Sequence, residues 1–269
     1  MKLSNSRRFA VVTGASSGIG VAYAERMAER GYDLILVARR RDRLEDVARR
    51  IEIKTKRTVE IVTADLADAT DLLRIEALLT EREDIDVLIN NAGLGALGPT
   101  SKVTADALEN LIKINILALT RLTHAALPGF LRRNSGTIIN IASMIAVMPT
   151  PSGAGYSGSK AYVLNFTRSL QMELTKTSII VQAILPGPVR TEFFEASGLA
   201  AAPFPNELFM SAEQLVDTAL QALDQGELVC FPSLENASLW TGFEDARIAL
   251  SRALMQSGKP ATRYSEKAR

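Results

Sequence analysis

The stretch FAVVTGASSGIG, residues 9–20, decides the fold, because an apolar run leads through a glycine-rich turn into a helix-like segment. Glycines at 14, 18 and 20 let the backbone turn tightly and approach a pyrophosphate group. Such a group lies at a helix N-terminus, where free N–H groups and the helix dipole favour anions. The Gly-x-x-x-Gly-x-Gly spacing is not the commoner dinucleotide-binding spacing. An ordinary turn before a helix has similar glycines, so the place of this loop after the first strand is what favours a dinucleotide.

The alternation of short apolar runs and longer polar segments continues along the chain. Strands are expected at residues 9–13, 33–38, 58–63, 86–90, 136–142, 178–185 and, more weakly, 227–231. Helices are expected at 18–30, 41–54, 68–82, 104–132, 155–176, 211–225 and 236–256. Strands that are apolar throughout fit a parallel sheet covered on both faces. Strict strand–helix alternation therefore predicts an α/β, doubly wound Rossmann-type fold, with a mainly parallel seven-stranded sheet and helices on both faces.

The organisation predicts one domain over residues 1–269. Within it we expect a substrate-covering segment at about 188–212 and a C-terminal helix and tail at about 236–269. The apolar run near the N-terminus is shorter than the roughly 7–15 residues of a signal core. No uncharged apolar stretch approaches the roughly 18–20 residues of a membrane span. We therefore expect a cytoplasmic protein that does not bind a membrane.

Composition excludes several function classes. The chain has 31 basic and 30 acidic side chains, which give a formal net charge of +1, and it has one histidine and one cysteine. This balance provides no global field for nucleic acid. One histidine and one cysteine cannot supply the usual ligands of a zinc site, so we expect no metal. We interpret His124 as a packing or solvent-facing residue and Cys230 as a small core residue.

Three arginines follow the second strand directly, at 39–41. In a dinucleotide fold an acidic residue about 20 positions after the glycine loop binds the ribose diol, whereas a nearby arginine accommodates a 2′-phosphate. Guanidinium groups bind phosphate bidentately. The sequence therefore predicts NADP(H) rather than NAD(H), with NAD(H) still possible, and position favours Arg39 over Arg40. The alternative is a solvated helix start, although basic residues are not favoured at a helix N-terminus.

Polar residues also follow the third and fourth strands. Asp65, which precedes Leu66, could accept a hydrogen bond from the adenine amino group or could simply cap the next helix. The sequence NNAG occupies residues 90–93, at the carboxyl end of a strand, where ligands bind in open parallel sheets. Such exits are also common turns.

Tyr156 and Lys160 stand four residues apart in a helical segment, so they share a face. Ser143 comes just after the fifth strand. Bringing a tyrosine pKa from near 10 to about 7–8 requires about 3–4 kcal/mol. An ammonium group about 4 Å away supplies about 4 kcal/mol at an effective dielectric near 20. The pair thus suits a proton-transferring tyrosine, although this spacing alone is more typical of an amphipathic helix face. We interpret Tyr162 as packing.

Together, these motifs resemble the short-chain dehydrogenase/reductase (SDR) family of the single-domain type, in its NADP-preferring subgroup, over about residues 8–192. The resemblance rests on TGxxxGIG at 13–20, DL at 65–66, NNAG at 90–93, Asn115, Ser143, YxxxK at 156–160 and PGxVxT at 186–191. It implies that Tyr156 is the acid in reduction and the base in oxidation. Lys160 would lower the tyrosine pKa and hold the nicotinamide ribose, and Ser143 would orient the substrate oxygen. Asn115 would hold a water that links Lys160 to a proton relay.

The resemblance also implies a set of cofactor-binding residues along the carboxyl edge of the sheet. They are Gly14, Ser16, Ser17, Gly18, Ile19, Gly20, Arg39, Arg40, Asp65, Leu66, Asn91, Ala92, Gly93, Tyr156, Lys160, Pro186, Gly187, Val189 and Thr191.

The implied function is an NADP(H)-dependent oxidoreductase that transfers a hydride between nicotinamide C4 and a small-molecule carbonyl or secondary alcohol. Methionines and phenylalanines in residues 144–151 and 193–210 suggest an apolar substrate pocket, or else packing of a lid or subunit interface. A homodimer or homotetramer is expected through the helices at 104–132 and 155–176. The alternatives are a regulatory or scaffold protein that binds the cofactor without turnover, and an isomerase or dehydratase of the same fold.

Overall fold

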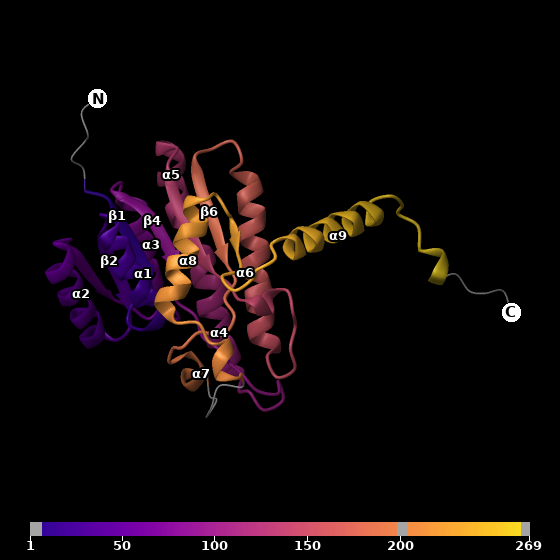
Figure 1. The fold of residues 1–269 in the computed structure, drawn as a ribbon, viewed down its shortest axis with the longest axis horizontal. Helices are drawn as coiled ribbons and strands as arrows, with labels where there is room; N and C mark the ends of the chain where they lie inside the picture. The colour runs from indigo at the N-terminus through magenta and orange to yellow at the C-terminus, as the bar shows by residue number, and fades with distance from the viewer. Residues whose placement is uncertain (1–6, 198–203, 265–269) are drawn as a thin grey trace. The chain divides into compact units, whose positions relative to one another are not determined.

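The structure is a computed structural model that describes residues 7–197 and 204–264 (Figure 1). The chain divides into two compact units, Met1–Pro232 and Ser233–Arg269. The first unit contains the sheet and the pocket described below. A single domain over 1–269 stays a prediction.

Within the described residues of the first unit, seven parallel strands form one sheet in the order β3-β2-β1-β4-β5-β6-β7. The strands are β1 (Phe9–Thr13), β2 (Asp33–Ala38), β3 (Val59–Thr63), β4 (Ile85–Asn90), β5 (Gly136–Ile141), β6 (Ile179–Ile184) and β7 (Val229–Cys230). The chain moves from β1 to β2 and β3 on one side and then returns to β4 on the other. The strand order therefore reverses beside β1, which is where open α/β sheets bind ligands. The predicted fold class is confirmed.

Helices cover both faces of this sheet. They are α1 (Gly18–Glu29), α2 (Arg41–Thr55), α3 (Ala69–Glu81), α4 (Ala105–Ile112), α5 (Leu119–Arg133), α6 (Ala154–Glu173), α7 (Phe193–Ala196) and α8 (Ala212–Asp224). Short 3-10 turns occur at Met144–Ala146 and Asn206–Leu208. Alternate residues of β1 enter two separate cores, because side chains along a strand point to opposite faces. Ala10 and Val12 pack in the core under α1, α2 and α8, whereas Phe9 and Val11 pack in the core under α3, α5 and α6.

The prediction of one continuous helix over residues 104–132 is wrong in one respect. A π-helical segment, Lys113–Ala118, separates α4 from α5. The stretch Ala105–Arg133 is long and apolar enough to cross a membrane by length and composition alone, and 56% of its most apolar window is buried. Ala118, Leu122 and Phe130 lie in the core of the first unit, as in the core helix of a globular domain.

The second unit contains one long helix, α9 (Ser238–Leu254), and a 3-10 turn at Thr262–Tyr264. The helix lies within the range predicted at 236–256. Leu239, Leu250 and Leu254 on it are exposed.

Candidate active site

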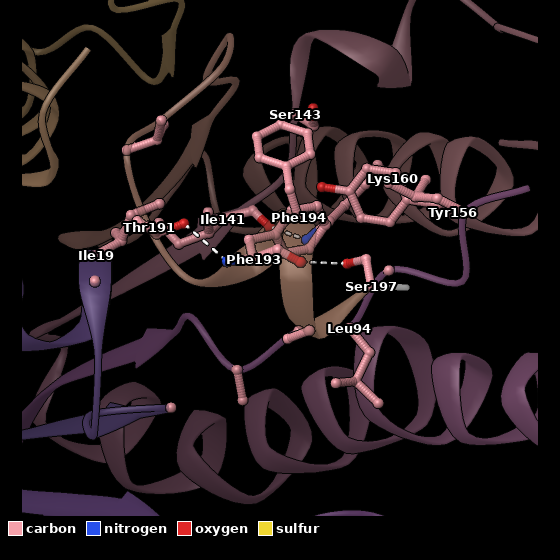
Figure 2. Close-up of a pocket in the computed structure, with 18 of the residues that line it drawn as sticks. Ile19, Leu94, Ile141, Ser143, Tyr156, Lys160, Thr191, Phe193, Phe194 and Ser197 are labelled. Atoms are coloured by element: carbon pink, nitrogen blue, oxygen red, sulfur yellow. Dashed lines mark hydrogen bonds between the residues drawn. The ribbon is translucent and has the colours of Figure 1, made fainter. Parts of the chain in front are cut away.

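A cavity of about 790 Å³ lies at the carboxyl ends of the strands and contains most of the predicted site (Figure 2). It is lined by the glycine loop, by the exits of β2 to β6, by α6 and by α7. Every predicted catalytic and cofactor residue lines it except Gly20 and Asn115. Sequence reasoning missed several lining residues. Leu94, Gly95, Leu97, Pro99 and Ile114 are among them, and so is Glu192.

The glycine loop is held against the exit of β4 by close backbone contact. Gly14 has φ +66°, and a Cβ there would lie 2.9 Å from the Cα of Ala92. A Cβ on Gly20 would lie 2.3 Å from the carbonyl oxygen of Gly14, so Gly20 supports the loop from within and does not line the cavity. Thr13 joins the two strands, because its hydroxyl accepts hydrogen bonds from the backbone N–H groups of Asn91 and Ala92, both at 3.0 Å.

This loop fits the pyrophosphate of a dinucleotide. Ser17 is the N-cap of α1, and within the described residues no side chain caps its first N–H groups. The first turn of α1 also contains no acidic residue. Unpaired N–H groups and the positive end of the helix dipole favour an anion at this position.

Arg40 approaches the glycine loop more closely than Arg39, and which of the two arginines binds a 2′-phosphate stays a prediction. The Arg40 guanidinium donates to the hydroxyls of Ser16 at 3.2 Å and Ser17 at 3.0 Å. Arg39 lies beside Asp65, with 3.9 Å between its guanidinium nitrogen and the carboxylate. Arg40 is the N-cap of α2, and its hydrogen bonds to Ser16 and Ser17 join the start of that helix to the loop.

Asp65 does not cap the following helix, which removes one of its two sequence interpretations. The N-cap of α3 is Asp68, whose carboxylate accepts from Thr70 and Asp71. The Asp65 carboxylate instead accepts from the N–H of Ala67 at 3.0 Å and lines the cavity. An adenine contact remains a prediction for it.

Tyr156, Lys160 and Ser143 converge on the cavity, and Figure 2 shows the three side chains close together. The Lys160 ammonium group lies 5.7 Å from the centre of the Tyr156 ring and donates a 2.7 Å hydrogen bond to the carbonyl of Ile141. Ser143 follows the end of β5, and its hydroxyl donates to the carbonyl of Pro186 at 3.5 Å. The spacing of four residues therefore places Tyr156 and Lys160 on the same face of α6, toward the cavity, as predicted.

The pKa values differ from the simple expectation that the lysine charge dominates. Burial raises the pKa of Tyr156 to about 12 and outweighs the effect of the nearby Ser143 hydroxyl, which acts to lower it. Burial also lowers the pKa of Lys160 to about 8. The Lys160 ammonium is held by the carbonyl of Ile141, 5.7 Å from the centre of the Tyr156 ring. These residues by themselves therefore keep the phenol protonated at neutral pH, which suits a proton donor.

Asn115 lies in the π-helical segment and holds neighbouring backbone in place. Its amide accepts from the N–H of Leu94 at 2.8 Å and donates to the carbonyl of Leu94 at 2.9 Å. It also donates to the hydroxyl of Ser159 at 3.0 Å, and that hydroxyl donates to the carbonyl of Tyr156. Asn115 thus ties the Leu94 loop to α6. The π-helical turn, a feature frequent at functional sites, aims its side chain there. The predicted water contact stays a prediction.

Aromatic rings from the segment after β6 line the part of the cavity beside Tyr156. The ring of Phe193 lies 5.3 Å from that of Tyr156, and Phe194 packs edge-on against Phe193. The Ser197 hydroxyl donates to the carbonyl of Phe193 at 2.6 Å. A Cβ on Gly95 would lie 2.2 Å from this hydroxyl oxygen, so α7 is seated directly on Gly95. Residues 198–203 of the predicted substrate-covering segment lie outside the described residues.

His124 and Cys230, which the sequence analysis interpreted as structural residues, do not line this cavity. His124 is exposed on α5. Cys230 is buried in the core beneath α8, and burial raises the pKa of its thiol to about 12. At neutral pH the thiol is therefore protonated, as suits a packing residue.

The family model of the short chain dehydrogenases matches residues 8–201, and the chain therefore belongs to the short-chain dehydrogenase family. The inactive hydroxysteroid dehydrogenase-like protein 1 of Homo sapiens is 38% identical over 187 residues, which are 68% of this chain and 56% of that protein. The very-long-chain 3-oxoacyl-CoA reductase-B of Danio rerio is 36% identical over 71% of this chain and 63% of its own length. The match thus spans less than two thirds of either relative.

Solved structures match nearly the whole chain. A short-chain dehydrogenase from Sphingobium yanoikuyae, in complex with NADPH, is 40% identical with a TM-score of 0.92, over 96% of this chain and 100% of that one. A bulky-bulky ketone specific alcohol dehydrogenase from Comamonas testosteroni is 36% identical with a TM-score of 0.88, over 97% of this chain and 100% of that one.

Proposed function

We propose that the chain is an NADP(H)-dependent oxidoreductase that interconverts a ketone and a secondary alcohol, with Tyr156 as the acid or base. The observation that carries this proposal is the convergence of Tyr156, Ser143 and Lys160 on one cavity that continues to the glycine loop. The cofactor, when bound, supplies or accepts the hydride at its nicotinamide.

The side chains of the protein then handle the substrate oxygen. Ser143 donates a hydrogen bond to it and orients it. Tyr156, whose pKa is raised to about 12 by burial, is protonated and can give its proton to the developing alkoxide. Lys160 contributes a positive charge below its pKa of about 8, which stabilises the phenolate that forms when Tyr156 gives up its proton.

Preference for NADP(H) is supported by charge at the exit of β2. Arg39 and Arg40 line the cavity where an NAD-binding site would present a carboxylate. Arg40 also lies against Ser16 and Ser17, which add two hydroxyls for a phosphate oxygen. The Sphingobium yanoikuyae protein, whose structure contains NADPH, supports the same cofactor.

The substrate class that fits the cavity is a bulky apolar ketone. Phe193, Phe194 and Phe204 line its outer part together with Ile145 and Met148. Large aromatic and sulfur-containing side chains favour apolar substituents on both sides of the carbonyl. The similarity to the Comamonas testosteroni enzyme, which is specific for bulky-bulky ketones, supports this assignment. A cytoplasmic location and a homodimer or homotetramer are part of the proposal.

A panel of ketones and alcohols with NADPH, NADH and their oxidised forms tests the proposed activity. We expect turnover, followed by absorbance of the reduced nicotinamide, with diaryl or aryl-alkyl ketones and NADPH. Small aliphatic ketones should turn over more slowly. A preference for NADH, or for small polar carbonyls, would contradict the proposal.

A protein that binds the cofactor without turnover is the second candidate, because the human relative is named inactive. This chain has Tyr156, Lys160 and Ser143 together at the cavity, which favours the enzyme. Tight NADPH binding without turnover of any substrate in the panel would favour the binding protein instead.

A further inference from the structure

Glu192 joins the substrate side of the cavity to the adenosine side. It immediately precedes α7, and its carboxylate accepts from the guanidinium groups of Arg43 at 2.6 Å and Arg40 at 3.0 Å. These arginines belong to the start of α2, where Arg40 is the N-cap and Arg43 lies in the first turn. Arg40 also donates to the hydroxyls of Ser16 and Ser17 in that loop.

The surroundings of this carboxylate resemble the surroundings that a phosphate requires. Two guanidinium groups and two nearby hydroxyls are the donors that bind phosphate oxygens. Arg43 and Arg40 hold the pKa of the Glu192 carboxyl below its usual range, so it is an anion at neutral pH. Side-chain exposures of 41% for each arginine and 49% for Glu192 leave the pairs open to water, where such contacts are weak and exchange readily.

We propose that Glu192 is an internal competitor for the 2′-phosphate of NADP(H), and that Arg43 belongs with Arg40 to the site that selects this phosphate. The proposal rests on the proposed function, since it assigns the residues that choose its cofactor. A phosphate and a carboxylate cannot share these guanidinium groups without repulsion, so binding of one releases the other.

Release of Glu192 has a consequence at the substrate end. The next residue, Phe193, packs on Tyr156, and α7 is seated on Gly95 through Ser197. The Glu192 ion pairs anchor the start of this segment to α2. NADP(H) therefore removes an anchor of the cover over Tyr156, whereas NAD(H), without a 2′-phosphate, leaves it in place. The Glu192 carboxylate therefore couples the choice of cofactor to the opening of the cavity beside Tyr156.

Equilibrium binding to the Glu192→Gln variant tests the competition without any turnover. The probes are adenosine 2′,5′-bisphosphate and NADPH, which contain the phosphate, and 5′-AMP and NADH, which lack it, each titrated by calorimetry. We expect the variant to bind the first two about threefold to fivefold more tightly, the scale of one exposed ion pair, and the other two unchanged. Glu195→Gln, on the adjoining helix α7, should leave all four affinities unchanged.

Arg43→Gln provides the reciprocal arm and should weaken only the two probes that contain the phosphate. Hydrogen exchange of residues 193–197 should accelerate in wild type with adenosine 2′,5′-bisphosphate but not with 5′-AMP, and should be fast in Glu192→Gln with either. Unchanged or weaker binding of the phosphate probes by Glu192→Gln overturns the competition. An equal change in affinity for all four probes also overturns the competition, because Glu192 would then affect nucleotide binding regardless of the 2′-phosphate.

The two proposals fail in different ways. Wild type that binds 5′-AMP as tightly as the bisphosphate removes the cofactor preference and the competition together. A protein that shows the expected four affinities but turns over no ketone keeps the competition and loses the proposed activity.

Discussion

Lys160 has its ammonium group buried beside Tyr156, and this burial costs folding free energy. Burial lowers its pKa to about 8, so between that pH and the ordinary lysine value of about 10.5 the unfolded chain binds more protons than the folded one. The unfolding free energy therefore rises with pH across that window. Below pH 8 the full penalty is present.

Lys160→Met should consequently be more stable than wild type at pH 7, by about 1–3 kcal/mol after loss of the Ile141 hydrogen bond. The difference in unfolding free energy between the two proteins should narrow at pH 9, because part of the wild-type lysine is then neutral. Urea unfolding at the two pH values measures both. Lys176→Met, at an exposed site just after α6, should show neither effect. A Lys160→Met protein no more stable than wild type at pH 7 would contradict the burial argument.

The exit of β2 allows a second comparison between neighbouring residues. Arg40 contacts the glycine loop, whereas Arg39 faces Asp65. We expect Arg40→Ala to lower the ratio of kcat/KM for NADPH over NADH by about tenfold, near 1.4 kcal/mol. Arg39→Ala should change that ratio less. Steady-state kinetics with both cofactors gives the four values, and a larger loss for Arg39→Ala would restore the order that sequence position alone suggested.

Asn115 illustrates what could and could not be predicted for a single residue. A polar side chain amid isoleucines must be buried and must find partners, and the structure confirms its burial. Its partners, Leu94 and Ser159, come from distant parts of the chain and meet it through a π-helical turn. Apolar periodicity cannot distinguish that turn from a continuous α-helix, so the local geometry was not predictable.

At the scale of elements, strands and long helices follow from apolar patterning, but short elements do not. The helix α7 has four residues, too few to show a period. Its position depends on the contact between Ser197 and Gly95, which no local pattern encodes. The region around α7 was therefore predicted only as a substrate-covering segment at about 188–212, with no helix assigned to it.

Gly95→Ala tests the seating of α7. The added Cβ would displace Ser197, so α7 must shift away from the mouth of the cavity. We expect KM for a bulky ketone to rise by about fivefold, near 1 kcal/mol, with a smaller change in kcat. The double variant Gly95→Ala/Ser197→Gly removes the clashing side chain and should recover most of the loss. Equal KM values for wild type and Gly95→Ala would show that α7 does not define the substrate site.

At the scale of the whole molecule, alternation of strands and helices was sufficient to predict the sheet and the edge that holds the site. The strand order reverses beside β1, and the glycine loop, Asn91 and Ser143 all follow strands at that edge. The pattern could not predict which charged side chains pair with one another around the cavity. Contacts such as that between Glu192 and Arg43 join segments far apart in the sequence and depend on the completed fold.

In the proposed reaction, Tyr156 transfers the proton in an NADPH-dependent reduction. The most direct measurement compares wild type and Tyr156→Phe for both NADPH binding and turnover of a bulky aryl ketone. We expect kcat to fall by at least about a hundredfold, the usual scale of lost general acid catalysis, while the NADPH Kd stays within about twofold. A Tyr156→Phe protein with wild-type kcat would contradict the assignment of Tyr156 as the proton donor.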